Sequence, residues 1–487
     1  MKYLSKNEVI QPAWLDYPEK VMFFGTGVLL RGLPLYFIDK ANKQAVFQGR
    51  VVVVKSTAHG DISRYERQDN CFTTVVRGIE AGAAVEENIV NCAISRVFTA
   101  ASDWDRIVAI GSSPDLTLVV SNTTEVGIAY QPERIGTDSP ESFPAKLLAI
   151  LLARYKAFEG DNDKGLVIVP TELISENGQK LRTILNQLAA YNELDEAFIA
   201  WLNDANFFCN SLVDRIVPGE IKGAFKEELE RQFGYVDDLM IMAEPYRLWA
   251  IEGDHTVKEK LSFCQVDSGV KVVPSIAEFK ELKLRLLNAP HTFCCSIAHL
   301  RGFETVKEAM KNANFVDFMS TLMTEEISQC LPDAIPAETI TTFAATVLDR
   351  FRNESLEHKW LSISMNYTTK VRMRCVGLLE AWYAKHQSVP QHMAYAFAAY
   401  LRFMKVVKQE GEVYYGAVNG AFYPINDTEA AYFATIWADN ELTTTERVDT
   451  ILKNESLWGV DLLALPGFAE TVSQNLQEII EQPALIG

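Results

Sequence analysis

An apolar strand that leads into a glycine turn and then a helix most constrains how this chain can fold. Residues 20–24 are typical of a buried strand, Gly25-Thr26-Gly27 follows directly, and residues 28–42 have helical periodicity. In such a turn the glycines let the backbone approach a pyrophosphate, whose charge the helix N-terminus favours. Residue 30 is Leu, so the third glycine of G-x-G-x-x-G is absent. The segment predicts dinucleotide binding, with a tight strand-to-helix turn as the alternative.

The strand and helix signals alternate through the first half of the chain. Buried strands are expected at 51–54, 116–120 and 166–169, helices at 104–110 and 144–158, and a hairpin from 71–77 and 91–97. This order predicts βαβ units and a largely parallel sheet. Amphipathic helical segments dominate later, at 276–300, 305–330, 337–352 and 367–405. We therefore expect a Rossmann-like α/β dinucleotide-binding domain over 1–274, followed by a mainly helical substrate-binding domain over 275–487.

Composition excludes several classes of partner. The chain has 487 residues, 48% of them hydrophobic, and a formal net charge of -18, which argues against binding to nucleic acid or an anionic membrane. We see no signal peptide and no apolar run of membrane-spanning length, so we expect a cytoplasmic protein. The eight cysteines form no C-x-x-C pair and are expected to be reduced thiols without disulfides. Monomer and dimer both remain open.

Polar residues follow two of the expected strands, at the edge where open α/β sheets bind ligands. Lys55-Ser56-Thr57 ends the second strand, where enzymes specific for NAD often carry an acidic residue, so both NAD and NADP remain open. Ser121 to Glu125, SNTTE, follows a later strand; a helix N-cap is its alternative role. The expected cofactor-binding residues are Gly25, Thr26, Gly27, Val28, Leu29, Arg31, Lys55, Asn122, Thr123, Thr124 and Glu125.

Lys283, Asn288 and His291 have the spacing Lys-x4-Asn-x2-His on an expected amphipathic helix. Pro290 is expected to end or kink that helix, so that the side chains converge on a ligand. A lysine with a lowered pKa can act as an acid or base, an asparagine can hold an alkoxide, and a histidine can orient the reacting oxygen. A solvated lysine, a turn asparagine and a structural histidine are the alternative.

One cluster has partial metal-ligand spacing. His291, Cys294, Cys295 and His299 could share a helix face, but no second Cys/His cluster completes a zinc site. We expect no bound metal.

Several segments together resemble the mannitol dehydrogenase family of polyol-specific long-chain dehydrogenases, over essentially the whole chain. They are GTGxxxR at 25–31, SNTTE at 121–125, SLVDRIVP at 211–218, the Lys283/Asn288/His291 set, and RFRN at 350–353 with Thr369-Lys370 downstream. Within the family, PTELI at 170–174 and RFRNESLEHKWLSISMNYTTKVRMR at 350–374 are similar to the members that reduce tagaturonate to altronate. Two positions depart from the polyol-specific members, namely Leu173 in place of an asparagine and Ser362 in place of an arginine.

The resemblance implies metal-independent, reversible hydride transfer between NAD(H) and the keto group of a small anionic sugar acid. Lys283 would be the acid/base, Asn288 the oxyanion donor and His291 the orienting residue. Glu172, Asp214 and Lys370 are expected to bind substrate. Their alternatives are a cap of the Asn177-Gly178 turn, an ion pair with Arg215, and a solvated lysine. A fructuronate or polyol substrate, or a nucleotide-sensing protein without turnover, remain the competing functions.

Overall fold

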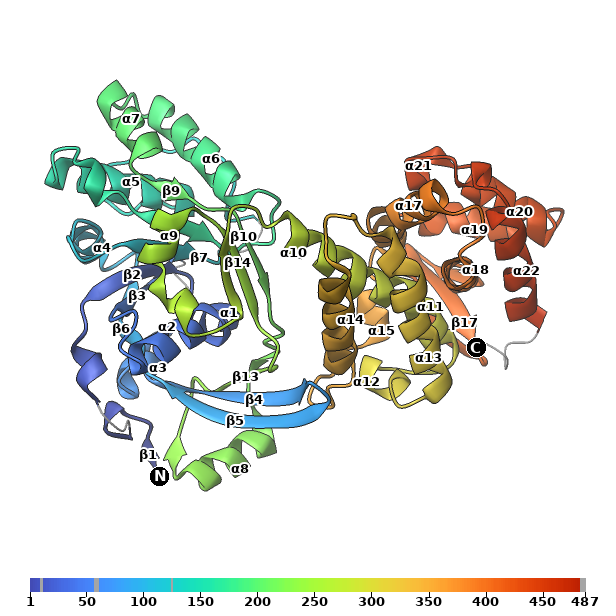
Figure 1. The fold of residues 1–487 in the computed structure, drawn as a ribbon, viewed down its shortest axis with the longest axis horizontal. Coiled ribbons are helices and arrows are strands. Elements are labelled where there is room, and N and C mark those ends of the chain that lie inside the picture. The colour runs from blue at the N-terminus through green and yellow to red at the C-terminus, as the bar shows by residue number, and fades with distance from the viewer. Residues whose placement is uncertain (9–11, 57–60, 124–125, 482–487) are drawn as a thin grey trace. The chain divides into compact units, whose positions relative to one another are not determined.

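The computed structural model describes residues 1–8, 12–56, 61–123 and 126–481. Contacts divide the chain into two compact units. Unit 1 comprises Met1–Arg77 and Ala84–Ala277, and unit 2 comprises Gly78–Ala83 and Glu278–Gly487. In Figure 1 unit 1 is coloured blue to yellow-green, and unit 2 is coloured yellow to red except for Gly78–Ala83, which is light blue.

Unit 1 is built on a six-stranded sheet whose strand order is β6-β3-β2-β7-β8-β9. All of its pairings are parallel, as the alternating sequence pattern predicted. The order reverses between β2 and β7, which is the doubly wound arrangement that binds dinucleotides at the switch point. The strands are β2 (Glu19–Phe24), β3 (Arg50–Lys55), β6 (Ile94–Thr99), β7 (Leu118–Ser121), β8 (Val167–Pro170) and β9 (Phe207–Phe208).

Both faces of this sheet are buried, because alternate residues of each strand point into separate cores. Val21 and Phe23 pack with α1 (Val28–Gly32), α2 (Pro34–Lys43) and β14 (Leu248–Glu252). Met22 and Phe24 pack with helices on the opposite face. Those helices are α4 (Trp104–Gly111), α5 (Phe143–Ala157), α6 (Asn177–Tyr191) and α7 (Glu196–Asp204). Near-continuous apolar strands are the expected signature of a sheet covered on both sides.

The first helix differs from its expected form. One helix over 28–42 was expected, but the structure has α1 and α2 separated at Leu33, where φ is -129° and ψ is -75°. Pro34 begins the second helix, because proline lacks the backbone N–H that a continuous helix would need at this position.

The expected hairpin is also placed differently. Its arms are β4 (Phe72–Glu80) and β5 (Ala83–Asn91), whereas Ile94–Thr99 is strand β6 of the central sheet. The turn is the pair Ala81-Gly82, with φ of 52° and 76°. Two positive φ values in a two-residue loop match the right-handed twist of the flanking strands. The hairpin tip, Gly78–Ala83, belongs to unit 2, where the Gly82 N–H donates to Asp349 Oδ2 at 2.9 Å.

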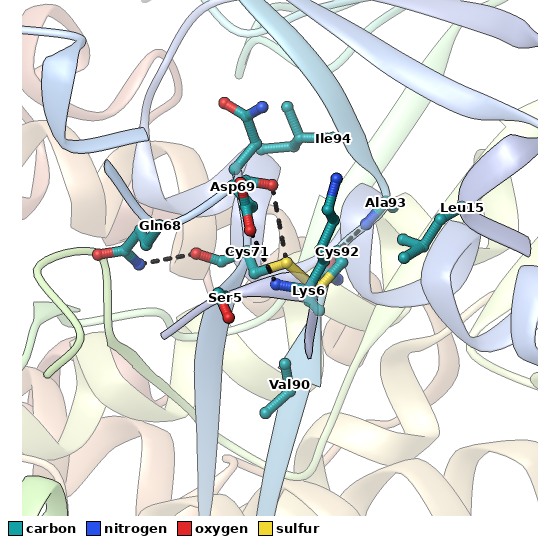
Figure 2. The surroundings of a disulfide bond; sticks show 12 residues. Ser5, Lys6, Leu15, Gln68, Asp69, Cys71, Val90, Cys92, Ala93 and Ile94 are labelled. Atoms are coloured by element: carbon teal, nitrogen blue, oxygen red, sulfur yellow. Dashed lines mark hydrogen bonds between the residues drawn. A yellow bond between two sulfur atoms is a disulfide. The ribbon is translucent and has the colours of Figure 1, made fainter. Parts of the chain in front are cut away.

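The expectation that all cysteines are reduced was wrong for one pair. Cys71 and Cys92 form a disulfide at the base of the hairpin, shown in Figure 2. The two residues are equally far from the Ala81-Gly82 turn, so the hairpin brings them opposite each other with 4.3 Å between their Cα atoms. That separation is typical of a non-hydrogen-bonded cross-strand pair. The spacing about the turn was the sequence signal for this bond.

The remaining strands of unit 1 form two smaller sheets and one short pair. One sheet has the order β10-β14-β15 and another the order β11-β13-β4-β5. Their new members are β10 (Ser211–Asp214), β11 (Gly219–Glu220), β13 (Ile241–Ala243) and β15 (Val270–Val273), and the short pair is β1 (Lys2–Tyr3) with β12 (Tyr235–Val236). The connecting helices are α3 (Ser63–Arg67), α8 (Gly223–Phe233) and α9 (His255–Lys260).

Unit 2 is mainly helical, as expected, around one large apolar core. Buried residues of α11 (Ala289–Leu300) and α18 (Gln391–Phe403) pack in its centre, and α22 (Phe468–Glu481) covers α18. The other helices are α10 (Ala277–Leu282), α12 (Val306–Ala309), α13 (Ala313–Thr321), α14 (Ala337–Phe351), α15 (Trp360–Ile363), α16 (Tyr367–Val371), α17 (Gly377–Lys385), α19 (Ala430–Ala438), α20 (Thr444–Leu452) and α21 (Glu455–Trp458). A three-stranded sheet, β16 (Lys408–Glu410), β17 (Val413–Val418) and β18 (Ala421–Pro424), was not expected. Within the described residues, no helix combines the length and apolarity needed to cross a membrane.

Candidate active site

The glycine turn of unit 1 lies against the end of a neighbouring strand. β2 pairs with β7 so that Phe24 is opposite Ser121, and the Asn122 N–H donates to the Phe24 carbonyl at 3.0 Å. Gly25 has a φ of +125°, and a Cβ there would lie 2.8 Å from the Asn122 carbonyl oxygen. Only glycine tolerates both the conformation and the close approach. The backbone therefore forms a cradle at the switch point that a side chain at residue 25 would fill.

The polar loop after β7 is held by one buried carboxylate. Glu172 Oε1 accepts from the Thr123 N–H at 2.8 Å and from Thr123 Oγ1 at 2.9 Å, while Oε2 accepts from Ser121 Oγ at 3.0 Å. Burial raises the pKa of Glu172, and these hydrogen bonds oppose that rise. Asn122 Nδ2 donates to Thr171 Oγ1 at 3.0 Å. Thr124 and Glu125, also expected at the cofactor, lie outside the described residues.

Other expected cofactor residues have different surroundings. Arg31 is 2% exposed, and its terminal nitrogens donate to the Leu239 carbonyl and to Glu220. Lys55 is 5% exposed at the end of β3. Next to it, Ser56 Oγ is buried and has no hydrogen-bond partner among the described residues, which is consistent with a ligand at this edge. Thr26 and Gly27 complete the turn, and Val28 and Leu29 begin α1, whose N-terminus carries no side-chain cap within the described residues.

The expected substrate residues are divided between the units. In unit 1, Glu172 holds the Thr123 loop as described, and Asp214 ends β10 and is 7% exposed. Its neighbour Arg215 donates to the carbonyls of Glu244 and Gly32 at 2.9 and 2.6 Å, and burial lowers the pKa of Arg215 to about 10. Lys370 is half-buried in unit 2.

Pro290, which was expected to end or kink its helix, does not end it. The backbone stays helical from α10 through the π-helical segment Lys283–Asn288 into α11. The φ and ψ values of Ala289, directly before the proline, are -68° and -45°. A π-helical turn is one residue wider than an α-helical turn, so it accommodates the proline, which has no N–H for the usual hydrogen bond.

This wider turn also changes which side chains share a face. In an α-helix, Lys283 and Asn288 would lie about 140° apart around the axis, because each residue advances by about 100°. Bonding between residues i and i+5 stacks positions five apart instead. Asn288 and His291 are three apart and already share a face. The π-helical turn therefore places Lys283 closer to the helix face of Asn288 and His291 than a regular turn would.

His291 lies in an aromatic and cationic environment within unit 2. It is 8% exposed, its ring centroid is 4.0 Å from that of Phe351 and 5.2 Å from that of His358, and its Nε2 is buried without a hydrogen-bond partner among the described residues. Burial, followed by the charges of His358, Arg350 and Arg374, holds the pKa of His291 well below its usual value. His291 is therefore neutral at pH 7 and has one ring nitrogen available to a ligand.

The cluster weighed for zinc binding does not converge in the structure. Cys295 Sγ donates to the Trp360 carbonyl at 3.2 Å, while the His299 ring lies 4.5 Å from that of Tyr423. Burial raises the pKa values of the Cys294 and Cys295 thiols, which disfavours the thiolates that zinc requires. No group of three metal-ligating side chains occurs in the part of the chain that the structure describes.

Comparison with known proteins identifies the family. The mannitol dehydrogenase Rossmann domain matches residues 19–265, and the mannitol dehydrogenase C-terminal domain matches residues 275–480. The chain belongs to the mannitol dehydrogenase family.

Curated relatives in this family resemble the chain over nearly its full length. The altronate oxidoreductase of Halalkalibacterium halodurans is 35% identical over 486 residues, covering 98% of this chain and 94% of the relative. The altronate oxidoreductase of Bacillus subtilis is 34% identical over 484 residues, covering 99% and 96%.

Two solved structures share the fold. A substrate-free D-sorbitol dehydrogenase has a TM-score of 0.80 at 18% identity, with coverage of 100% of this chain and 99% of that chain. Pseudomonas fluorescens mannitol 2-dehydrogenase, in a complex with NAD and D-mannitol, has a TM-score of 0.67 at 20% identity and coverage of 99% and 98%.

Proposed function

We propose that this protein is a nicotinamide-dependent oxidoreductase that interconverts tagaturonate and altronate. The observation that carries the substrate class is full-length similarity to altronate oxidoreductases at about 35% identity. The π-helical turn, which places Lys283 closer to the face of Asn288 and His291, supports the chemistry, because secondary-alcohol oxidation needs a positioned proton acceptor.

We assign cofactor binding to unit 1 and proton transfer to unit 2. The glycine cradle at Gly25 and the open N-terminus of α1 suit a pyrophosphate, and Asn122 and Thr123 adjoin that cradle. When bound, the dinucleotide supplies or accepts the hydride. Lys55 is the basic residue nearest the expected ribose site and is only 5% exposed at the end of β3, so we favour NAD(H) over NADP(H).

The proton is assigned to Lys283. As hydride reaches the keto carbon, the carbonyl π bond breaks, and protonated Lys283 Nζ gives its proton to the oxygen. The Asn288 amide donates a hydrogen bond to that oxygen while charge develops on it. His291 is neutral at pH 7 because burial and nearby cations lower its pKa, so it orients a substrate hydroxyl through Nε2 rather than supplying the proton. In the oxidation direction, neutral Lys283 removes the hydroxyl proton.

A Lys283→Ala variant tests this assignment. Turnover of tagaturonate with NADH should fall about 10²- to 10⁴-fold, the usual contribution of general acid–base catalysis, while NADH binding measured by fluorescence is retained. Lys280→Ala, one turn earlier in α10, is the matched control and should keep wild-type turnover. Near-normal turnover of Lys283→Ala would remove Lys283 from the mechanism.

Substrate and cofactor are tested together with wild-type protein. Initial rates are compared for NADH and NADPH with tagaturonate, fructuronate and fructose, each with a chelator control. Selective oxidation of NADH by tagaturonate is expected. A preference for fructuronate or fructose would move the assignment within the family, and cofactor binding without turnover would instead support a nucleotide sensor.

A further inference from the structure

The geometry points to Arg374 as the residue that binds the substrate carboxylate and thereby selects a sugar acid over a neutral sugar. This inference rests on the proposed function and names a specificity residue for the same site. It assigns a role to a side chain that the Lys283, Asn288 and His291 chemistry does not use.

Arg374 lies directly beside the helix turn that carries Asn288 and His291. Its Nη1 donates to Thr292 Oγ1 at 3.2 Å, and Thr292 Oγ1 donates in turn to the Asn288 carbonyl at 2.9 Å. Thr292 is adjacent to His291, and the charge of Arg374 contributes to lowering the pKa of the His291 ring. The guanidinium therefore contacts the residue that follows His291, and this residue is one helical turn from Asn288.

The backbone around Arg374 is also specialised. Arg374 belongs to another π-helical segment, Arg372–Val376, and its carbonyl accepts from Arg285 Nη1 at 3.0 Å. Arg285 itself lies in the π-helical segment Lys283–Asn288. One hydrogen bond thus joins these two π-helical segments, and such segments frequently occur at functional sites.

The charge of Arg374 has no acidic partner among the described residues. It forms no ion pair there, and neither does Lys370, whose Nζ donates to the Ile363 carbonyl at 2.8 Å. Lys370 and Arg374 are four residues apart, so they share a helix face. Burial lowers the pKa of both groups, and the charge of Arg374 lowers the pKa of Lys370 further. Two neighbouring, partly desolvated cations of this kind are stabilised by a bound anion.

A carboxylate suits this site better than a hydroxyl does. A guanidinium has five N–H donors in a planar fork that matches the two oxygens of a carboxylate, and Thr292 accounts for one donor. The adjacent His291 Nε2, buried and unpartnered among the described residues, suits a hydroxyl on the same ligand. A polyhydroxylated carboxylate satisfies both groups.

The test compares Arg374→Gln with Arg372→Gln, an exposed neighbour in the same segment. Arg374→Gln should raise KM for tagaturonate about 10- to 100-fold, the usual effect of losing a charge-assisted hydrogen bond, with a smaller change in kcat. Arg374→Lys, which keeps the charge and loses the fork, should lie between. Arg372→Gln should match the wild type. Calorimetric titration with altronate supplies the same comparison without turnover.

The methyl ester of altronate separates a carboxylate contact from a hydroxyl contact. The ester should bind wild type about 10- to 100-fold more weakly than altronate does, and Arg374→Gln should add little to that loss. If Arg374→Gln weakens the acid and the ester equally, or leaves KM within about threefold of wild type, the assignment is wrong. Failure of wild type to reduce tagaturonate would refute the proposed function separately, because calorimetry still tests Arg374 against aldonates.

Discussion

Replacement of Gly25 by alanine is the sharpest test of the cradle in unit 1. The φ of +125° lies in a region that L-residues rarely adopt, and this costs about 1 to 3 kcal/mol. The added Cβ would also lie 2.8 Å from the Asn122 carbonyl oxygen, a backbone atom that a side-chain rotation cannot move.

Relief of that contact requires β2 and β7 to separate at their ends. The hydrogen bond that this separation weakens runs from the Asn122 N–H to the Phe24 carbonyl, at 3.0 Å. Such a bond is worth about 0.5 to 1.5 kcal/mol. With the backbone strain, we expect Gly25→Ala to lower the free energy of unfolding of unit 1 by about 2 to 4 kcal/mol, and to weaken NADH binding.

Two other glycines separate the causes. Gly82 has a φ of +76°, and a Cβ added there would have no neighbour within 4 Å, so Gly82→Ala carries the conformational cost alone, about 1 to 2 kcal/mol. Gly27 has no positive φ, and the nearest neighbour of an added Cβ would be Asn122 Oδ1 at 3.7 Å, so Gly27→Ala should cost less than about 1 kcal/mol. Urea unfolding and NADH fluorescence titration measure both effects. If Gly25→Ala and Gly27→Ala lower the free energy of unfolding equally, the steric argument is wrong.

Two further predictions concern stability. Burial lowers the pKa of His299 from 6.5 to about 4, so the unfolded chain binds the proton more readily, and stability should be lost as pH falls below about 6.5. Linkage gives a loss of unfolding free energy of about 2 kcal/mol between pH 7 and pH 5. Urea unfolding at the two pH values should show that His299→Gln removes this loss, whereas His255→Gln, at an exposed histidine, keeps it. If His299→Gln loses as much stability as the wild type does, the prediction is wrong. The Cys71–Cys92 bond spans 21 residues, so reduction should lower the free energy of unfolding by about 3 kcal/mol in wild type and not in Cys92→Ser. Equal sensitivity to reductant in both proteins would show that the bond does not contribute.

The parallel sheet was predictable because its strands are short, apolar and separated by amphipathic helices. The run Val51 to Val54 is typical of a strand buried on both faces, and β3 is buried on both faces. The hairpin was harder, since Asn91 and Ile94 belong to different strands with only two residues between them. A periodic pattern indicates strands but does not fix where one ends when the next begins at once. The Ala81-Gly82 turn, with Cys71 and Cys92 at equal distances from it, was the sequence feature that indicated which residues of the two arms pair.

The candidate site shows a different limit of sequence reasoning. The segment 276–300 has helical periodicity and is helical in the structure, yet counting by 3.6 residues places Lys283 on a different face from Asn288. Pro290 signalled an irregularity, and a break was the simplest form for it to take. A widened turn accommodates the missing N–H of Pro290 and keeps the backbone of α11 helical, which matters because the residues of α11 are mostly buried. The spacing of five and then three residues is therefore informative in itself, because a π-helical turn brings Lys283 closer to the face of Asn288 and His291 than an α-helical turn would. Arg374 lies in another π-helical segment, which is bonded to the first through Arg285, so sequence periodicity alone does not place it beside the turn that carries Asn288 and His291.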